Sequence, residues 1–249
     1  MKEAGQRGPI GQRRKVAAGG RKEKLPRTIA IDGPSASGKS SVGYLVAERL
    51  GYLFLDTGAM YRALAWLALQ RGVHLEDEAG LGRLAAEVDM ELGPPAAGSG
   101  ERCTIWVDGE DLTATLRRPE VEAAVSLVSR APQVREVLVA LQQRLAGRQR
   151  VVMAGRDIGT AVLPDADLKV YLDASPAERA RRRQAQMAEL GMSSSQSHIR
   201  EEILQRDAID SGREASPLRA ADDAIVINTD GLDQAQVVEK IVALVEGRS

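Results

Sequence analysis

Aromatic residues are scarce in this 249-residue chain, which contains one Phe, two Trp and four Tyr. Modules that bind single-stranded nucleic acid stack bases on exposed aromatic rings, so the sequence argues against a base-stacking nucleic-acid reader. The single Cys103 excludes an internal disulfide, and one Cys with two His is too few for a Cys/His zinc cluster. These counts suit a reducing compartment, and we expect a cytoplasmic protein.

Long hydrophobic runs are also missing. No stretch of about 18 residues is free of charged side chains, which argues against a membrane-spanning helix. Hydrophobic residues make up 43% of the chain and charged residues 28%, as is usual for soluble globular proteins. The length favours one large domain, or a domain that carries an insertion. We therefore expect a soluble protein with no membrane partner.

Acidic residues are scarce in one region, the N-terminal segment 1–27, which holds nine Lys/Arg and two Asp/Glu. The segment is rich in glycine and lacks the apolar stretch of a secretory signal, so we predict a basic disordered tail. Because the formal net charge of the whole chain is −1, the remaining residues are acidic. The tail is either functionally neutral or attracts RNA or phosphate nonspecifically, and no other nucleic-acid contact is expected.

Short apolar runs alternate with helical periodicity after the tail. The predicted strands are Thr28–Asp32, Tyr52–Leu55, Arg150–Ala154, Leu168–Asp173 and Ala224–Asn228. The predicted helices are Lys39–Leu50, Ala59–Arg71, Arg118–Ser129, Pro132–Ala146, Pro176–Leu190, Ile199–Ile209 and Leu232–Val245. This alternation predicts an α/β fold with a five-stranded parallel, doubly wound sheet flanked by helices. Ligand sites in such folds lie at the carboxyl ends of the strands.

The region of about 73–117 has a different pattern. A short helix is predicted near Leu81–Val88, and a loop rich in Pro, Gly and Ser follows at Gly93–Gly100. The apolar run Arg102–Val107 then leads into the turn Asp108-Gly109, which is typical of a β-hairpin. We therefore predict a small insertion that contains a hairpin.

A phosphate-binding motif lies between the first predicted strand and the first predicted helix. Its residues match G-x-x-x-x-G-K-[ST], and those expected to bind ATP are Gly33, Pro34, Ser35, Ala36, Ser37, Gly38, Lys39, Ser40 and Ser41. Backbone N–H groups would face a polyphosphate, Lys39 would reach its β and γ phosphates, and the Ser40 hydroxyl would ligate Mg²⁺. The alternative is a Gly/Ser turn that binds nothing. However, a lysine in the first turn of a helix opposes the helix dipole, and an anionic ligand explains its presence.

The motif alone is compatible with GTPases, motor ATPases and small kinases. The chain contains no N-K-x-D motif of the kind that recognises guanine, and it lacks the long domain of a motor ATPase. Instead, four arginines crowd the helix after the fourth strand, namely Arg179, Arg181, Arg182 and Arg183. They form either a solvated helix face or a mobile lid whose guanidinium groups neutralise a transferring phosphoryl group and exclude water.

Together with these features, further motifs make the chain resemble the bacterial cytidylate kinases, which transfer phosphate from ATP to CMP or dCMP. The resemblance extends from Ile29 to the C-terminal helix. It rests on the segments Ile31-Asp-Gly-Pro-Ser, Leu55-Asp-Thr-Gly-Ala-Met-Tyr-Arg62, Val134-Arg-Glu136, Gly155-Arg-Asp-Ile-Gly-Thr160, Leu172-Asp-Ala-Ser175 and Arg206 to Leu218. The basic tail has no counterpart in it.

The resemblance implies a role for each of several residues in binding the acceptor. Arg62, Arg156 and Arg213 match positions that hold the acceptor phosphate, and a guanidinium group is planar, multidentate and always charged. The other positions are Ser126, Arg135 and Asp157 for the cytosine base, Arg206 and Asp210 near the ribose, and Thr57 in the monophosphate-binding turn. Taken singly, an arginine of this set could be a surface residue and Asp157 a helix cap. Asp56 either joins the Mg²⁺ shell through water or only orders its turn.

The resemblance also implies a division of the chain. It places a P-loop core at 28–56 and 151–249, with a lid at about 177–215, and a monophosphate-binding domain at 57–150. We expect a monomer that uses ATP with Mg²⁺ to phosphorylate CMP and dCMP. Lys39, Arg179, Arg182 and Arg183 are the expected catalytic residues, because they would neutralise the transferring group. The alternatives are the same fold with UMP or a small alcohol as acceptor, and a nucleotide-dependent RNA- or ribosome-associated factor.

Overall fold

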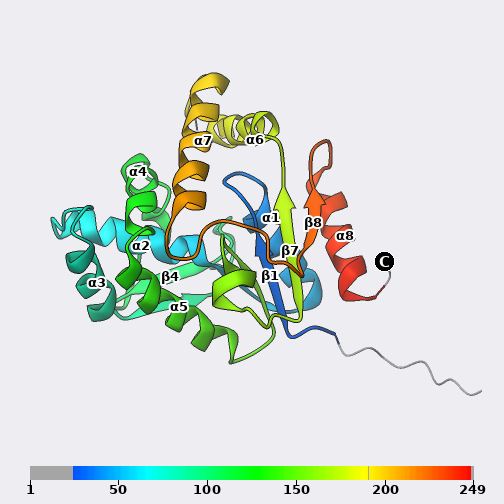
Figure 1. Cartoon of the computed structure of the whole chain (residues 1–249), viewed down its shortest axis with the longest axis horizontal. Coiled ribbons are helices and arrows are strands. Elements are labelled where there is room, and N and C mark those ends of the chain that lie inside the picture. Colours follow the sequence, from blue (N-terminus) through cyan, green and yellow to red (C-terminus); the bar gives the residue numbers. More distant parts are fainter. Residues whose placement is uncertain (1–24, 190, 248–249) are drawn as a thin grey trace, which may run out of the picture.

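A parallel sheet forms the centre of the protein. The computed structural model describes residues 25–189 and 191–247, and within these ranges five parallel strands pair in the order β2-β6-β1-β7-β8 (Figure 1). Their bounds are β1 (Thr28–Asp32), β2 (Leu53–Asp56), β6 (Val151–Ala154), β7 (Leu168–Asp173) and β8 (Ile225–Asn228). The predicted α/β fold class is confirmed, and each predicted strand bound agrees with the structure to within one residue.

Strand register aligns the carboxyl ends of the strands. Ile31 of β1 is paired with Ala154 of β6, and Ala154 is also paired with Asp56 of β2. On the other side of β1, Asp32 is paired with Tyr171 of β7. The segments that follow β1, β2, β6 and β7 therefore leave the sheet from one edge, which is where an α/β sheet binds its ligands.

Helices cover both faces of the sheet. Ile31 packs in one apolar cluster with side chains of α1 (Lys39–Leu50) and α8 (Gln234–Val245). The neighbouring Ala30 packs on the opposite face with side chains of α5 (Pro132–Ala146). Because both residues are fully buried, β1 is apolar on both faces, as is usual for the central strand of a parallel sheet.

A second apolar core lies beside the sheet and is built from α2 to α5 and a small antiparallel sheet. Its elements are α2 (Thr57–Gln70), α3 (Glu78–Glu87), β3 (Met90–Gly93), β4 (Thr104–Val107), β5 (Glu110–Asp111), the short 3₁₀ helix η1 (Thr113–Thr115), α4 (Pro119–Val128) and α5. The predicted hairpin is confirmed as β4 and β5. The sequence prediction omitted β3, whose four residues follow closely after α3.

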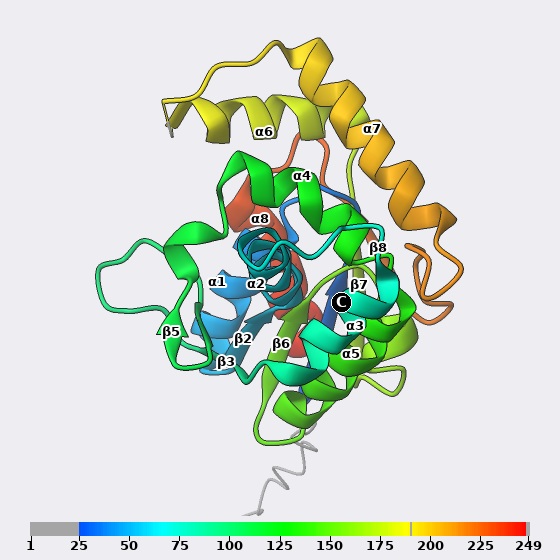
Figure 2. The same ribbon diagram turned by 90° about the vertical axis from the view of Figure 1, so that its left-hand side faces the viewer.

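Two lid helices, α6 (Pro176–Glu189) and α7 (Gln196–Gly212), arch over the carboxyl edge of the sheet and over α4 (Figure 2). They pack on each other through Ala180, Ile199 and Ile203. The second lid helix is longer than the predicted Ile199–Ile209, because the Ser195 hydroxyl accepts a hydrogen bond from the His198 N–H and so caps an earlier start. The predicted end of the first lid helix, Leu190, lies outside the described residues.

The described chain begins next to the sheet. Residues 1–24 of the predicted basic tail lie outside the described residues. The Tyr52 hydroxyl donates a hydrogen bond of 2.7 Å to the Pro26 carbonyl oxygen, and the Arg27 N–H donates one of 2.8 Å to Asp167. The last two residues of the predicted tail are therefore tied to the core. Within the described ranges, no helix combines the length and apolar character needed to cross a membrane.

Candidate active site

The loop between β1 and α1 has the backbone shape of a phosphate cradle. Gly33 has φ +151°, and a Cβ at this position would lie 2.2 Å from the Leu172 carbonyl oxygen, so a side chain cannot be accommodated. Gly38 has φ +93° and caps the N-terminus of α1. The first N–H groups of a helix have no partner within the helix, and they carry the positive end of its dipole. The loop and helix together thus form an anion site made of backbone.

Lys39 adds a buried cation to this loop. Its side chain is only 6% exposed, and its Nζ donates a hydrogen bond of 2.7 Å to the Pro34 carbonyl oxygen. Burial, and then the positive charge of Arg156, hold the pKa of Lys39 well below its ordinary value. The buried Ser37 hydroxyl has no hydrogen-bond partner in the part of the chain that the structure describes. A bound polyphosphate would favour the charged form of Lys39 and could accept a hydrogen bond from Ser37.

Two of the predicted lid arginines hold the loop itself. Arg179 donates from Nη1 to the Ser35 carbonyl oxygen at 3.1 Å and forms an ion pair of 2.6 Å with Asp207 of α7. Arg182 donates to the Ser37 carbonyl oxygen at 3.3 Å and to the Thr229 carbonyl oxygen at 2.7 Å. The first lid helix is therefore joined to the phosphate loop through guanidinium groups. Their role in neutralising a transferring phosphoryl group stays a prediction.

The other two arginines of the first lid helix lie differently. Arg181 is 64% exposed and pairs with Glu178 on its own helix, so it belongs to the solvated face. Arg183 donates to the Gln186 side chain at 2.9 Å and lies 3.8 Å from Glu122 of α4. Of the predicted catalytic arginines, Arg183 is thus the one that approaches α4 and the second core formed by α2 to α5.

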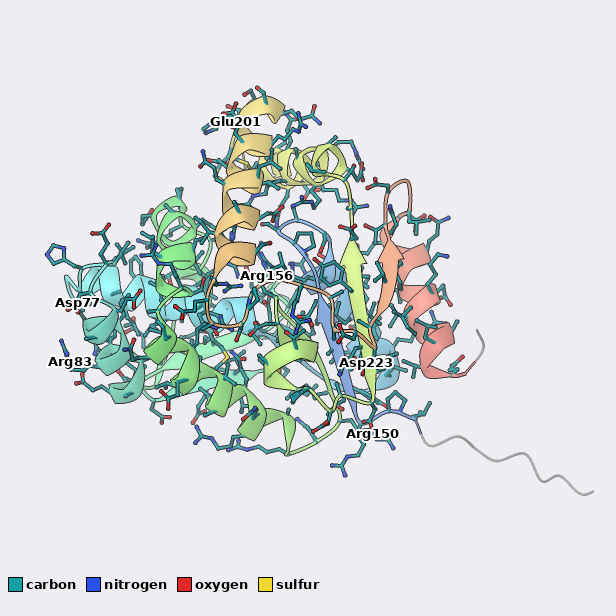
Figure 3. All side chains as sticks on the ribbon, in the orientation of Figure 1. Asp77, Arg83, Arg150, Arg156, Glu201 and Asp223 are labelled. Atoms are coloured by element: carbon teal, nitrogen blue, oxygen red, sulfur yellow. The ribbon has the colours of Figure 1, made fainter. Side chains whose placement is uncertain are left out.

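Arg156 connects the phosphate loop with the second lid helix. It follows β6, lies between α7 and the sheet (Figure 3), and donates from Nη1 to the Gly33 carbonyl oxygen at 3.3 Å. Its Nε donates to Asp210 at 2.8 Å. Burial raises the pKa of Asp210, but the charges of Arg156 and Arg213 outweigh it and leave this pKa below its ordinary value.

The residues predicted to read a base meet beside α4 and α5. Arg135 and Asp157 form a buried ion pair, and the Arg135 guanidinium lies 5.6 Å from the centre of the Tyr61 ring. The Ser129 hydroxyl donates to the Ser126 carbonyl oxygen at 3.1 Å, and Ser126 is itself buried. Arg135 also donates from Nη1 to the Ser129 carbonyl oxygen at 3.4 Å, which places the Arg135–Asp157 pair at the end of α4 that holds Ser126.

Arg213 closes this group from the end of α7. Its Nε donates to the Asp210 carbonyl oxygen at 3.1 Å, and its Nη1 donates to the Ser129 carbonyl oxygen at 3.5 Å. Arg213 is 7% exposed, and its Nη2 has no hydrogen-bond partner among the described residues. This nitrogen lies 3.6 Å from Asp210 Oδ1, too far for a hydrogen bond, so an oxygen-bearing ligand would stabilise this arrangement.

Arg62 and Arg206 converge on a carboxylate that the sequence interpretation missed. Glu122 of α4 accepts from Arg62 Nε at 2.8 Å and from Arg206 Nη1 at 3.2 Å. Burial acts to raise the pKa of Glu122, but Arg62, Arg206 and Arg183 lower it to about 2. A sequence signal existed, because Glu122 precedes Ser126 by four residues and so lies on the same face of the helix.

The turn after β2 holds the remaining predicted residues. The Thr57 hydroxyl donates to the Ala154 carbonyl oxygen at 3.0 Å and thereby ties β2 to β6. Asp56 caps α2 by accepting from the Gly58 N–H at 3.0 Å. Asp56 therefore orders its turn, while a contact with Mg²⁺ stays a prediction.

Asp32 was also missed as a site residue. Its carboxylate accepts backbone N–H groups from Ile158 and Gly159, each at 2.7 Å. These residues open the short π-helical turn η2 (Ile158–Val162), which the sequence prediction did not include. Burial raises the pKa of Asp32 to about 6. Asp32 fixes the turn that presents Arg156 and Asp157, and its place at the end of a strand before the phosphate loop was the available signal.

The fold and site define a P-loop phosphotransferase, in which a backbone cradle faces an arginine-rich second site beneath a helical lid. The chain belongs to the cytidylate kinase family, whose family model, described as cytidylate kinase, matches residues 29–247. The family resemblance predicted from the sequence motifs is thereby confirmed.

Two cytidylate kinases agree with the family match. The chain is 50% identical over 217 residues to a cytidylate kinase of Pelotomaculum thermopropionicum. The aligned region covers 87% of this chain and 95% of that protein. It is 48% identical over 219 residues to a cytidylate kinase of Chloroflexus aggregans, covering 88% and 94% of the two chains. A solved shikimate kinase of Acinetobacter baumannii in complex with shikimate matches with a TM-score of 0.45 and 17% identity, over 91% of this chain and 96% of that one.

Proposed function

We propose that this protein transfers the γ-phosphoryl group of ATP to CMP or dCMP, forming ADP and CDP or dCDP. One observation carries the proposal. Arg156 contacts the phosphate loop at Gly33 and the acceptor-side carboxylate of Asp210 with the same guanidinium group, so the two anion sites adjoin. The names of the relatives support the choice of a cytidine nucleotide as acceptor.

The protein needs to do little covalent work in such a transfer. Loop N–H groups and Lys39 would bind the β and γ phosphates of ATP, while Arg62, Arg156 and Arg213 would bind the phosphate of CMP. Alignment of the two anions and neutralisation of their charge provide most of the catalysis in phosphoryl transfer. The lid helices, joined to the loop by Arg179 and Arg182, would exclude water from the transferring group. In this proposal residues 57–150 form the acceptor domain, and 28–56 with 151–249 form the core and lid.

Mg²⁺ is expected to arrive with ATP. Ser40 lies in the first turn of α1, directly after Lys39, and offers a hydroxyl oxygen of the kind that Mg²⁺ prefers. Within residues 25–189 and 191–247, no group of three or more His, Cys, Asp or Glu is placed to hold a metal ion. This donor set fits an ion held mainly by phosphate oxygens and water, with Ser40 as a protein ligand. Ser40 would hold the ion at the phosphate loop, where the ion would supply positive charge that neutralises the charge developing on the phosphate oxygens.

The buried pair Arg135 and Asp157 supports selection of cytosine. A carboxylate only accepts hydrogen bonds and a guanidinium group only donates them. Asp157 would accept from the N4 amino group of cytosine, and Arg135 would donate to N3 or O2. Uracil would place its O4 against the carboxylate and its N3–H against the guanidinium, and both contacts would be repulsive.

An acceptor screen tests the proposal. ADP release would be measured with CMP, dCMP, UMP, AMP, GMP and shikimate, for the full chain and for a chain that starts at Leu25. We expect CMP and dCMP to exceed UMP in kcat/KM by about 10²-fold, because each unpaired polar contact costs about 1–3 kcal/mol. We also expect both chains to behave alike. A higher kcat/KM for UMP or shikimate would overturn the acceptor assignment, and ADP release that requires RNA and the N-terminal segment would favour the RNA-associated alternative.

A further inference from the structure

One carboxylate joins three helices above the candidate site. Glu122 of α4 contacts Arg62 of α2 at 2.8 Å, Arg206 of α7 at 3.2 Å, and Arg183 of α6 at 3.8 Å. Its side chain is 21% exposed, so these contacts are partly shielded from water. Two of the three partners are on the lid helices, and the third is an arginine that we assign to the acceptor phosphate.

The charges around Glu122 are unbalanced without it. Burial, and then the neighbouring Arg156, lower the pKa of Arg206 to about 10, and Arg62 adds further repulsion. The Nε of Arg206 is buried without a hydrogen-bond partner in the described ranges. Like charges repel strongly in a partly desolvated cluster. Removal of the Glu122 charge would therefore push the α7 arginine away from the acceptor side.

The contact with Arg62 also determines which of its nitrogens remain available. Glu122 binds Nε, while Nη1 lies against the first turn of α2, where a Cβ at Gly58 would come within 2.9 Å of it. The guanidinium plane is thus held from two sides. This arrangement leaves Nη2 as the nitrogen that can face a phosphate, because the five N–H donors of arginine form a rigid fork.

We infer that Glu122 is a positioning residue that latches the lid helices to the acceptor side and orients Arg62 for the acceptor phosphate. The part concerning the acceptor rests on the proposed function. The latch itself is a property of the protein without substrate. The two parts can therefore be tested separately.

Hydrogen exchange of the substrate-free protein tests the latch. Glu122→Gln keeps the shape and removes the charge, and Glu120→Gln is the matched control, because Glu120 is exposed on the same helix and lies 3.9 Å from Arg118. We expect amide exchange in the lid helices to become about 5- to 10-fold faster in Glu122→Gln, since local opening follows the loss of a charged contact. Exchange in α3 should not change. Equal lid exchange in the two variants would overturn the inference.

Steady-state kinetics test the effect on the acceptor. We expect Glu122→Gln to raise the KM for CMP about 10-fold and to leave the KM for ATP within about 2-fold of wild type. A lower KM for CMP would overturn the inference, because it would show that the carboxylate competes with the phosphate. An unchanged KM with faster lid exchange would also overturn the claim that Glu122 orients Arg62. If wild-type protein does not use CMP, the proposed function fails while the exchange result still decides the latch.

A double variant separates the latch from general destabilisation. Arg206→Gln should speed lid exchange to a similar extent. The double variant with Glu122→Gln should add less than about 2-fold to either single change, because both remove the Glu122–Arg206 contact and only the longer 3.8 Å contact with Arg183 is lost in addition. Additive effects would overturn the inference. Thermal melting followed by circular dichroism would establish that the single variants are folded.

Discussion

The proposed donor loop and the proposed acceptor cluster are built by different means. The proposed donor site is formed by eight consecutive residues, Gly33 to Ser40, whose backbone N–H groups and one buried lysine would face the ligand. The acceptor cluster is formed by side chains that come from α2, α4, α5, the turn after β6 and α7. Contiguous backbone sites can be recognised from local sequence, whereas an assembled side-chain site depends on the whole topology.

The two regions also differ in how their charge is balanced. Lys39 contacts a carbonyl oxygen, and its pKa is lowered because burial leaves its charge poorly compensated. In the acceptor cluster the arginines have internal carboxylate partners, and the pairs are Arg62 with Glu122, Arg156 with Asp210, and Arg135 with Asp157. A bound anion would therefore compensate the positive charge of the donor loop. The acceptor cluster is held in place before any ligand arrives.

The largest effect is expected in the donor loop. Lys39→Ala should reduce turnover below about one tenth of wild type, because loss of a charge-assisted contact to the transferring group costs at least 1.5–3 kcal/mol. Affinity for CMP should be largely retained. ADP release under saturating substrates measures the change, with Lys240→Ala on the exposed face of α8 as the control. Retention of more than a tenth of the turnover would refute the role of Lys39.

Removal of acceptor arginines should affect CMP rather than ATP. Arg156→Ala and Arg213→Ala should each raise the KM for CMP by about 10- to 100-fold, which corresponds to one charged hydrogen bond of about 1.5–3 kcal/mol. The exposed Arg219, 3.7 Å from Asp222, provides the control variant Arg219→Ala. Arg156 also contacts the phosphate loop at Gly33, so Arg156→Ala should raise the KM for ATP more than Arg213→Ala does. If neither variant alters the use of CMP, the acceptor site has been placed wrongly.

The buried pair should control the choice of base. Asp157→Ala should lose more kcat/KM with CMP than with UMP, and we expect the CMP to UMP ratio to fall by about 10-fold or more. Both nucleotides are compared on the same protein, so the ratio does not depend on the fraction that is correctly folded. A ratio equal to that of wild type would show that Asp157 does not read the base.

The smallest effect concerns Asp32. Its pKa of about 6 lies above the ordinary 3.8, so the folded state binds the proton more tightly than the unfolded state. The contribution of Asp32 to stability is therefore present at low pH and is lost as the pH rises from about 4 to about 6. The amide resonance of Gly159, which donates to Asp32, should titrate with a midpoint near 6. A midpoint near the ordinary value would contradict the burial argument.

The sequence predicted much of the fold, because its signals there were local. Five apolar runs identified the strands to within one residue, and the Gly-rich motif identified the donor loop. The strand β3 and the turn η2 were not predicted. The first contains Glu91 and Gly93 and so forms no apolar run, and the second is held by Asp32 across more than 120 positions of the chain. Local periodicity contains no record of such a distant contact.

The residues proposed to bind the acceptor were predicted through the family resemblance, and this role stays a prediction. The structure pairs Arg135 with Asp157 and Arg156 with Asp210. Glu122 and Asp32 were not predicted, because each acts on another site residue rather than through a recognisable motif. The positions of Arg179 and Arg182 also could not be read from the sequence. A run of arginines on one helix does not show which of them contact loop carbonyl oxygens and which face solvent.

Calorimetry of two variants against two ligands tests the separation of donor loop and acceptor cluster most directly. ATP with Mg²⁺ and CMP would each be titrated into Lys39→Ala and into Arg213→Ala. We expect a crossed result. Lys39→Ala should lose about 10-fold or more in affinity for ATP and keep its affinity for CMP, whereas Arg213→Ala should lose affinity for CMP and keep its affinity for ATP. Equal losses of both ligands in both variants would contradict it, because they would show that one shared site binds the two nucleotides.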